Sequence, residues 1–439
     1  MDPQTSATVT HLRRPPRVVP RSGHIISRAN IDERALKVLY RLKSAGYEAY
    51  LVGGGVRDLL LGREPKDFDV ATSALPEQVR ELFRNCRLIG RRFRLAHVHF
   101  GRDIIEVATF RSPHAAGADE GGAVTDAGRI LRDNVYGDID SDALRRDFTV
   151  NALYYNIDDF SVVDYVGGME DIEAGRIRTI GDPHLRFRED PVRMLRAVRF
   201  AAKLGFTIDP ATERAIFDLA GLLAEIPASR LFEEIQKLFL TGCAAQSFES
   251  LRHHGLFGEL FPQIETCLGE EEGGFPHMLL VRALENTDRR TAAGKPVTPA
   301  FLFAALLWDP LRRLMDEHRG HGLAAMEALQ LAADTVISRQ IARIAVPRRY
   351  TQMTRDIWTL QPRLARRTGA YPFRALAHPR FRAAYDFLEL RTLAGEEVPS
   401  LFEWWTEFQH AGDERRQAMI ETVPKAGATR RRRRKRASS

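Results

Sequence analysis

The sequence has few cysteines and no long run of apolar residues. Its 439 residues include only Cys86, Cys243 and Cys267, which are widely separated. Three scattered thiols exclude a disulfide framework and a cysteine-based zinc site. The histidine pair His253 and His254 is expected on the surface. No apolar run reaches the length of a membrane span, and the first residues lack the apolar core of a secretion signal. We therefore expect a reduced, cytoplasmic protein without membrane insertion.

The net charge of the chain is unevenly distributed. It amounts to +7 at pH 7. Eight basic and no acidic residues follow Thr422, and residues 1–28 carry five arginines and one aspartate, so the body between them has a net charge of −5. We interpret the two basic ends as tails that bind a polyanion, with RNA or DNA as the first candidate. The alternative is a solvated tail that only aids solubility.

The residue pattern divides the chain into five segments. Residues 1–24 and 412–439 are expected to be disordered and basic. Residues 25–168 show short strand and helix patterns in an order that predicts a small mixed sheet. From there the pattern is almost wholly helical, over 169–245 and 246–411. The expected fold class is α+β, with a sheet-containing head followed by helical regions.

Residues 51–70, LVGGGVRDLLLGREPKDFDV, hold the most informative motif. They are expected to form a strand, a glycine turn, a short helix and a second strand. The glycines allow close approach of the backbone to a ligand and offer amides to phosphate. Asp67 and Asp69 are expected to share one face of the second strand, where adjacent carboxylates are costly unless they hold divalent ions. The stretch predicts a site for a metal-bound nucleoside triphosphate; the alternative is a turn followed by capping aspartates. The expected phosphate contacts are Gly53, Gly54 and Arg57.

Two further acidic residues compete as the third carboxylate of this site. Glu106 interrupts the apolar strand IIEVATF, where a carboxylate needs a cation, either a metal ion or an arginine such as Arg111. Asp147 follows Arg145 and Arg146 in RRDFTVNAL. It either completes the metal site, orients a ribose while an arginine holds phosphate, or caps a helix. The sequence leaves this choice open.

A predicted helix carries a third cluster, in the segment REDPVRMLRAVRFAAKLG. Steps of three residues place Asp190, Arg193 and Arg196 along one drifting stripe. An aspartate beside an arginine can match the Watson–Crick edge of a base. The alternative is a helix cap with weak ion pairs.

Together these motifs resemble the class II nucleotidyltransferases, the superfamily of bacterial poly(A) polymerases and tRNA CCA-adding enzymes. The matching motifs are LVGGGVRDLLLG with DFD, then RRDFTVNAL, then EDPVRMLRAVRF, in the order and spacing of the family. The segment RLIGRRFRLAHV at 87–98 resembles the one that separates poly(A) polymerases from CCA-adding enzymes. The likeness to the bacterial poly(A) polymerase I family extends from about Gly23 to Gln409, and the basic tail fits it too.

The resemblance implies a polymerase-beta-like nucleotidyltransferase head, followed by a helical neck with base recognition and then helical body and leg regions that bind RNA. It implies template-independent addition of AMP from ATP to RNA 3′ ends, with release of pyrophosphate and with Mg²⁺ or Mn²⁺ as cofactor. This activity would promote RNA turnover. A CCA-adding enzyme and an inactive RNA-binding relative are the alternatives.

The same resemblance and the charge pattern give the expected site residues. The catalytic residues are Asp67, Asp69, Asp147 and Glu106, with Asp67 and Asp69 as metal ligands. The nucleotide-binding residues are Gly53, Gly54, Arg57, Arg146, Glu189, Asp190, Arg193, Arg196 and Arg199. The RNA-binding residues are Arg430, Arg431, Arg432, Arg433, Arg434, Lys435 and Arg436.

The expected partners are ATP and the 3′ ends of mRNA, regulatory RNA and tRNA precursors. RNA-degradation machinery and an RNA chaperone are further candidates. We expect a monomer.

Overall fold

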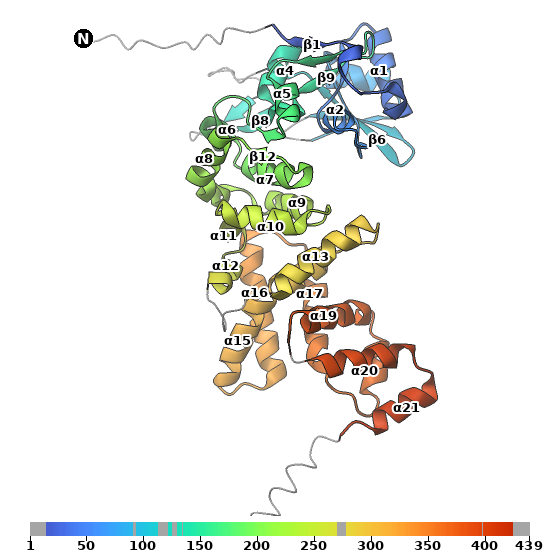
Figure 1. The fold of residues 1–439 in the computed structure, drawn as a ribbon, viewed down its shortest axis with the longest axis vertical. Coiled ribbons are helices and arrows are strands. Elements are labelled where there is room, and N and C mark those ends of the chain that lie inside the picture. Colours follow the sequence, from blue (N-terminus) through green and yellow to red (C-terminus); the bar gives the residue numbers. More distant parts are fainter. Residues whose placement is uncertain are drawn as a thin grey trace, which may run out of the picture. The chain divides into compact units, whose positions relative to one another are not determined.

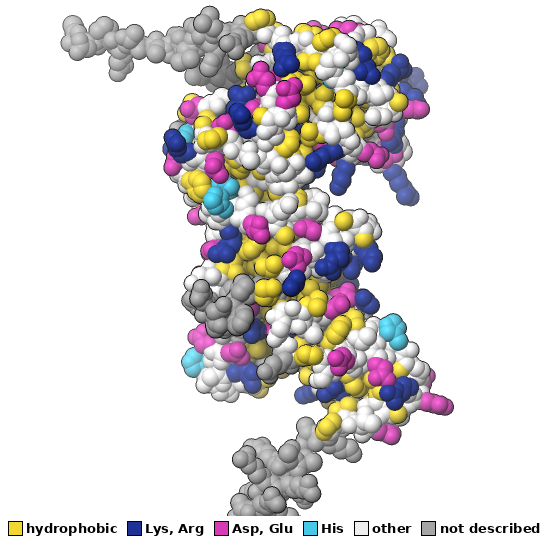
Figure 2. All heavy atoms as spheres, viewed as in Figure 1, with side chains coloured by type: hydrophobic (Ala, Val, Ile, Leu, Met, Phe, Trp, Pro, Cys, Tyr) yellow, Lys and Arg dark blue, Asp and Glu magenta, His cyan; other side chains and the backbone are white. Residues whose placement is uncertain are grey.

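The computed structural model describes residues 15–90, 94–112, 122–124, 130–133, 135–269, 278–396 and 398–424. The chain divides into two compact units, Met1–Leu222 and Leu223–Ser439 (Figure 1). We call them the N-terminal unit and the C-terminal unit. On the visible face, Lys and Arg side chains are interspersed with Asp and Glu side chains in each unit (Figure 2).

The N-terminal unit contains an eight-stranded mixed sheet with the order β1-β10-β9-β2-β3-β6-β5-β4. Neighbouring strands are antiparallel except β3 and β6, which are parallel. This confirms the predicted mixed sheet. The strands are β1 (Arg17–Val19), β2 (Ala49–Val52), β3 (Asp69–Thr72), β4 (Cys86–Ile89), β5 (Leu95–Phe100), β6 (Asp103–Thr109), β9 (Leu153–Tyr155) and β10 (Val162–Asp164). Two short pairs join β7 (Gly122–Val124) to β8 (Ile130–Asp133) and β11 (Arg176–Ile177) to β12 (Thr207–Ile208).

The helices of this unit are α1 (Glu33–Ser44), α2 (Gly54–Leu60), α3 (Pro76–Leu82), α4 (Ile139–Arg145), α5 (Gly168–Glu173), α6 (Pro183–Glu189), α7 (Val192–Leu204) and α8 (Pro210–Leu219). Helix α1 shows how the core forms. The Asp32 carboxylate caps it by accepting from the Arg34 amide at 2.7 Å. Its buried residues Val38, Leu39 and Leu42 share a core with apolar residues of the sheet. A rigid sheet therefore supports the strand ends at which the predicted site residues lie.

The regular elements of the C-terminal unit are all helices among its described residues, as predicted. It contains α9 (Ala228–Phe239), α10 (Ala244–His253), α11 (Leu256–Leu260), α12 (Pro262–Gly269), α13 (Met278–Ala292), α14 (Pro299–Leu306), α15 (Trp308–Gly320), α16 (Ala325–Arg343), α17 (Arg348–Leu364), α18 (Tyr371–Leu376), α19 (Phe381–Leu393), α20 (Pro399–His410) and α21 (Asp413–Glu421). No helix among the described residues is both long and apolar enough to cross a membrane.

The predicted disorder at the two ends is wrong for part of each segment. Strand β1 lies within residues 1–24 and pairs with β10, and Val19 is buried there. Helix α21 lies within residues 412–439, and its Met419 and Ile420 are buried in a core cluster with residues of α17, α19 and α20. In both cases a few apolar side chains pack against residues that are distant in sequence. The basic run from Arg430 lies outside the described residues.

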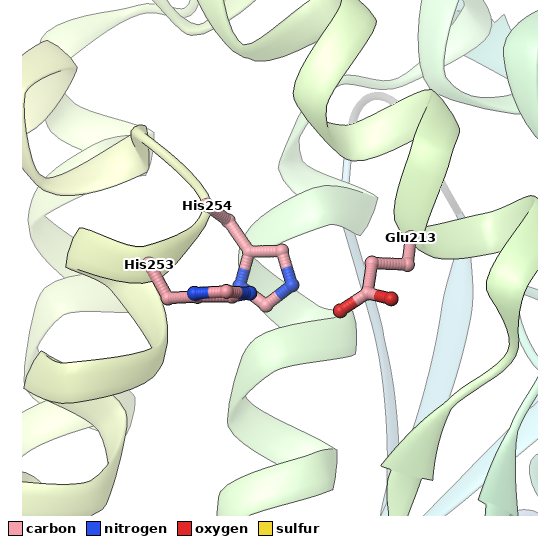
Figure 3. Close-up of side chains that lie close together, drawn as sticks. All are labelled: Glu213, His253 and His254. Atoms are coloured by element: carbon pink, nitrogen blue, oxygen red, sulfur yellow. The ribbon is translucent and has the colours of Figure 1, made fainter.

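The histidine pair is not wholly on the surface, which corrects the expectation. The rings of His253 and His254 lie edge to face with centroids 4.8 Å apart (Figure 3). His254 is buried, and its Nδ1 lies 2.7 Å from the carbonyl oxygen of Ser250. Burial of this ring follows from its place at the end of α10, where it continues the helix's buried face.

Candidate active site

Asp69 lies beside two other carboxylates at the start of a central strand. It is the first residue of β3, in register with Val52 on one side and Glu106 on the other. Burial raises the pKa of Asp69 to about 6, with the negative charges of Glu106 and Asp67 acting in the same direction and Arg146 opposing them. Since like charges crowd here, added positive charge would stabilise the ionised cluster. Oxygen ligands of this kind are those that Mg²⁺ prefers, so the residues present fit a magnesium site.

Asp67 does not lie on the strand, which corrects the sequence-based expectation. Strand β3 begins only at Asp69, and Asp67 is exposed in the loop before it. The backbone carbonyl of Asp67 passes 3.2 Å from where a Cβ on Gly55 would be. A side chain at Gly55 would therefore push against this loop. The carboxylate of Asp67 remains close enough to affect the pKa of Asp69.

Glu106 is half-exposed and lies on β6, the strand between β3 and β5. Its register partners are Asp69 on β3 and His97 on β5. His97 Nε2 lies 3.3 Å from Glu106 Oε1. His97 was missed from the sequence, because its place opposite Glu106 is set by strand register. The structure thus brings Glu106 to Asp69.

The glycine turn lies between Arg146 and Asp69. Gly53 has a φ of +71°, a conformation that favours glycine. A Cβ atom there would lie 3.6 Å from Arg146 Nη1 and 3.7 Å from Asp69 Oδ2. The bare backbone of Gly53 therefore keeps open the space where a cation and a phosphate would meet.

The guanidinium of Arg146 is oriented by hydrogen bonds to Tyr154 and Asp142. Its Nε donates to Tyr154 Oη at 2.9 Å and to Asp142 Oδ2 at 3.1 Å, and its Nη2 donates to the same Asp142 oxygen at 3.0 Å. The Tyr154 hydroxyl also donates to Asp142 at 2.7 Å. Tyr154 and Asp142 carried no motif signal in the sequence. They orient the arginine whose Nη1 faces Gly53.

A cavity of about 220 Å³ opens over these groups. Its charged lining combines the carboxylates of Asp69 and Glu106 with the guanidinium group of Arg146. A cavity with acidic and basic groups side by side can hold a cation and a phosphate together. The full lining is Val52, Asp69, Val70, Leu95, Glu106, Ala108, Arg111, Asp142, Arg145 and Arg146.

Arg57 does not lie in this cavity. It is only 2% exposed, and its Nε and Nη2 donate to Asp58 Oδ1 at 2.9 and 2.6 Å. Its Nη1 donates to Asn151 Oδ1 at 2.6 Å. The predicted direct contact of Arg57 with phosphate is therefore not supported by the geometry. Gly54 lies against it, since a Cβ there would be 3.5 Å from Arg57 Nη2.

Asp147 is engaged by protein donors. Arg196 Nε donates to its Oδ2 at 2.7 Å. Its Oδ1 accepts from the Phe148 amide at 2.8 Å and from Asn151 Nδ2 at 3.2 Å. Burial alone would raise the pKa of Asp147, but the charge of Arg196 and these hydrogen bonds hold it well below its usual range. The structure thus brings Asp147 to α7.

The residues predicted to read a base form a network of their own. Glu189 Oε2 accepts from Arg186 Nη1 at 2.6 Å and from Arg193 Nη1 at 2.9 Å. Asp190 is buried before the start of α7, where its carboxylate accepts from the Val192 amide at 3.3 Å. Arg193 and Asp190 are therefore ordered by neighbours within the same segment.

Two further residues of this region were missed from the sequence. Arg186 Nη2 donates to the carbonyl oxygens of Arg145 and Arg146 at 2.6 and 2.8 Å, which ties α6 to the segment that carries Arg146. Burial lowers the pKa of Arg186 to about 10. Phe200 is the second. The guanidinium carbons of Arg57, Arg196 and Arg199 lie 5.2, 5.2 and 4.4 Å from its ring centroid, within cation–π range.

Three family models match the chain. They are described as "Poly A polymerase head domain" over residues 49–178, "Probable RNA and SrmB- binding site of polymerase A" over 205–268, and "Polymerase A arginine-rich C-terminus" over 321–438. The first match begins at β2 and covers most of the sheet-containing head, and the second follows α7. The third covers the last helices together with the basic run from Arg430.

Whole-chain comparisons agree with the family models. Poly(A) polymerase I of Salmonella typhi is 51% identical over 422 residues, which cover 95% of this chain and 90% of that protein. Poly(A) polymerase I of Escherichia coli O6:H1 is 50% identical over 423 residues, with 95% and 91% covered. Among solved structures, the CCA-adding enzyme of Bacillus stearothermophilus in complex with CTP is 29% identical with a TM-score of 0.58, and 88% of this chain and 82% of that chain are covered. The chain therefore belongs to the bacterial poly(A) polymerase I family of the class II nucleotidyltransferases.

Proposed function

We propose that this poly(A) polymerase adds AMP from ATP to RNA 3′ ends without a template, through divalent ions held by Asp67, Asp69 and Glu106. The observation that carries the proposal is the placement of Asp69 in register with Glu106 and near Asp67. Burial, together with the charges of these two carboxylates, raises the pKa of Asp69 to about 6. Magnesium or manganese ions bound there would lower the pKa of the RNA 3′-hydroxyl and balance the charge of the phosphates.

The protein residues position the reactants. Arg146, fixed by Asp142 and Tyr154, directs Nη1 at the space above Gly53 and meets the triphosphate there. The RNA 3′-hydroxyl loses its proton to solvent, and its oxygen forms a bond to the α-phosphorus of ATP. The bond from that phosphorus to the bridging oxygen of the β-phosphate breaks, and pyrophosphate leaves. A guanidinium that is already oriented stabilises the phosphate charge without reorganisation.

We assign the third carboxylate to Glu106 and a positioning role to Asp147. Glu106 is the register partner of Asp69 and raises its pKa. The carboxylate oxygens of Asp147 instead accept hydrogen bonds from Arg196, Asn151 and the Phe148 amide. Asn151 in turn accepts from Arg57. We propose that Asp147 and Arg57 act together to hold the glycine turn against α7.

Recognition of adenine is assigned to the segment at 189–199. Without a template, the choice of base falls to the protein, and Asp190 with Arg193 offers an acceptor beside donors. Glu189 and Arg186 order this pair. Ordered polar groups discriminate strongly, because a wrong base leaves them unpaired. Arg196 and Arg199 are proposed to complete the nucleotide site from the next turns of α7.

The run from Arg430 to Arg436 is proposed to bind the RNA backbone, with binding that weakens as salt rises. The cytoplasmic location, the RNA classes, the RNA-degradation partners, the monomeric state and the division into head, neck and body remain part of this proposal.

The test is extension of an unstructured RNA by the purified protein, with Mg²⁺ and each nucleoside triphosphate supplied separately. We expect a long tail with ATP alone, and none from the Asp69→Asn variant. Use of CTP followed by arrest after a fixed number of additions would identify a CCA-adding enzyme instead. The 51% identity with a poly(A) polymerase over 95% of this chain favours the first outcome. No extension with any nucleotide would identify an inactive RNA-binding relative.

A further inference from the structure

One stretch of the C-terminal unit departs from the acidic balance of the body. Residues 357–385 contain six arginines and no aspartate or glutamate. The body of the chain has a net charge of −5, so this stretch concentrates positive charge within a folded region. Positive charge is therefore not confined to the two ends of the chain. The six arginines are Arg363, Arg366, Arg367, Arg374, Arg380 and Arg382.

Most of these arginines have no carboxylate partner among the residues that the structure describes. Arg382 pairs with Asp386 at 2.9 Å, and it is the exception. Arg363, Arg366 and Arg374 are exposed, at the end of α17, in the following loop and on α18. Elsewhere in this unit exposed arginines such as Arg415 form ion pairs. Unpaired guanidinium groups that lie close together repel, so this surface favours an anionic ligand.

An exposed aromatic ring lies among them. Tyr371, the first residue of α18, is 48% exposed. The guanidinium carbons of Arg366 and Arg374 lie 5.3 and 5.9 Å from its ring centroid. Trp405 and Phe381 of the same region are buried in the core instead, and Phe373 of α18 is less exposed than Tyr371, at 36%. Tyr371 therefore presents ring surface to the solvent, between two cationic side chains.

We propose that Arg363, Arg366, Tyr371 and Arg374, which we call the Tyr371 surface, bind single-stranded RNA. One base contacts the exposed ring of Tyr371, and Arg366 and Arg374 contact the flanking phosphates. A positively charged surface with an accessible aromatic ring is the common arrangement for single strands, since every base offers a π-face. Arginine suits phosphate better than lysine does, because its planar fork donates two parallel hydrogen bonds.

The inference rests on the proposed function, which makes RNA the substrate. It adds a binding site that is separate in sequence from both the carboxylate cluster and the basic tail. The surface is built on fixed elements, because Pro372 and Ala375 of α18 are buried beneath it. Substitution of the exposed side chains therefore leaves the core of the unit unchanged.

The test measures the affinity of the full chain for a fluorescent 20-nucleotide oligoadenylate by anisotropy, without ATP. Tyr371→Ala is expected to weaken binding roughly 5- to 150-fold. Tyr371→Phe keeps the aromatic ring and is expected to bind as the wild type does. The double variant R366E/R374E is expected to weaken binding more strongly and to reduce the slope of log affinity against log salt by about 1.4. The matched control is R289E/R339E, which makes the same charge change at exposed positions of the same unit.

An abasic oligonucleotide of the same length separates the two contacts. The affinity of the protein for this abasic strand is expected to be the same in Tyr371→Ala as in the wild type. It is expected to be weaker in R366E/R374E. Equal losses in R366E/R374E and R289E/R339E would overturn the proposal, as would an unchanged affinity of Tyr371→Ala. Binding of anionic vesicles or an acidic protein that is lost in R366E/R374E while RNA affinity is unchanged would also overturn it. The proposed function has its own readout: failure of the wild-type chain to extend RNA with ATP would contradict it, whatever these affinities are.

Discussion

Asp147 and Arg196 form an ion pair that joins the segment after α4 to helix α7. The two residues are 49 positions apart in sequence, and Asp147 is held ionised by this contact. The pair therefore fixes how the residues around Arg146 lie against α7. This relationship separates a supporting carboxylate from the carboxylates that face the cavity.

Loss of the arginine of this pair should destabilise the N-terminal unit. Arg196→Ala leaves the Asp147 carboxylate buried without its cation, and we expect the free energy of unfolding to fall by roughly 3 kcal/mol. Urea denaturation of the metal-free protein measures this change in the free energy of unfolding. Lys37→Ala is the control, because Lys37 forms only an exposed ion pair with Glu33, worth less than about 1 kcal/mol. Equal effects of the two substitutions would show that the buried pair is not structural.

The two candidates for the third carboxylate should respond differently to amidation. Glu106→Gln is expected to raise the Mg²⁺ concentration for half-maximal RNA extension roughly 10-fold or more, with an unchanged melting temperature of the metal-free protein. Asp147→Asn is expected to lower that melting temperature and to leave the Mg²⁺ requirement unchanged. The reverse pattern would assign the third ligand to Asp147.

The raised pKa of Asp69 predicts how stability depends on pH. The folded value of about 6 lies above the unfolded value of 3.8. Between them the folded state holds a proton that the unfolded state has lost, so the metal-free protein loses stability as pH rises from about 4 to about 6. Above pH 6 the decrease in the free energy of unfolding approaches about 3 kcal/mol.

Urea denaturation in EDTA at pH 4.5 and 7.5 tests this dependence, with Asp69→Asn as the reference. The free energy of unfolding of the wild type, relative to that of the variant, should be lower at pH 7.5 than at pH 4.5. Mg²⁺ added at pH 7.5 should stabilise the wild type and not the variant. A difference that is independent of pH would contradict the assigned pKa.

A methyl group at the glycine turn should block activity beyond any effect on folding. Gly53→Ala places a Cβ close to both Arg146 Nη1 and Asp69 Oδ2. It also strains a residue whose φ of +71° and ψ of −138° favour glycine, by about 1–3 kcal/mol. We expect RNA extension to fall by about 100-fold or more. Gly46→Ala is the matched control, because Gly46 also has a positive φ but no atom lies within 4 Å of the added Cβ. If Gly46→Ala reduces the rate as much, strain alone explains the loss.

The hydroxyl of Tyr154 should matter for ATP binding. Tyr154→Phe removes one of the groups that orient Arg146, and we expect the KM for ATP to rise roughly 2- to 12-fold, the equivalent of one hydrogen bond. Tyr155→Phe is the neighbouring control, since Tyr155 is buried in the core of the sheet. Steady-state kinetics with saturating RNA measures both variants. An effect on kcat alone would argue against a role of Arg146 in binding the triphosphate.

The sequence by itself determined the parts of this protein whose signals are local. The glycine turn, the Asp67 and Asp69 motif and the RRDFTVNAL segment are short patterns, and each lies within the N-terminal unit as expected. The change from mixed to helical periodicity likewise gave the fold class. Such features follow from neighbouring residues, so no distant contact is needed to predict them.

Only the tertiary structure decided which charged side chains face one another. Glu106 meets Asp69 through the parallel register of β3 and β6, while Asp147 is drawn to Arg196 and Arg57 to Asn151. A carboxylate or guanidinium takes its partner from whichever elements pack together, and that depends on contacts between residues far apart in the chain. The same motif residues could therefore be named from sequence, but their division into cavity groups and buried supports could not.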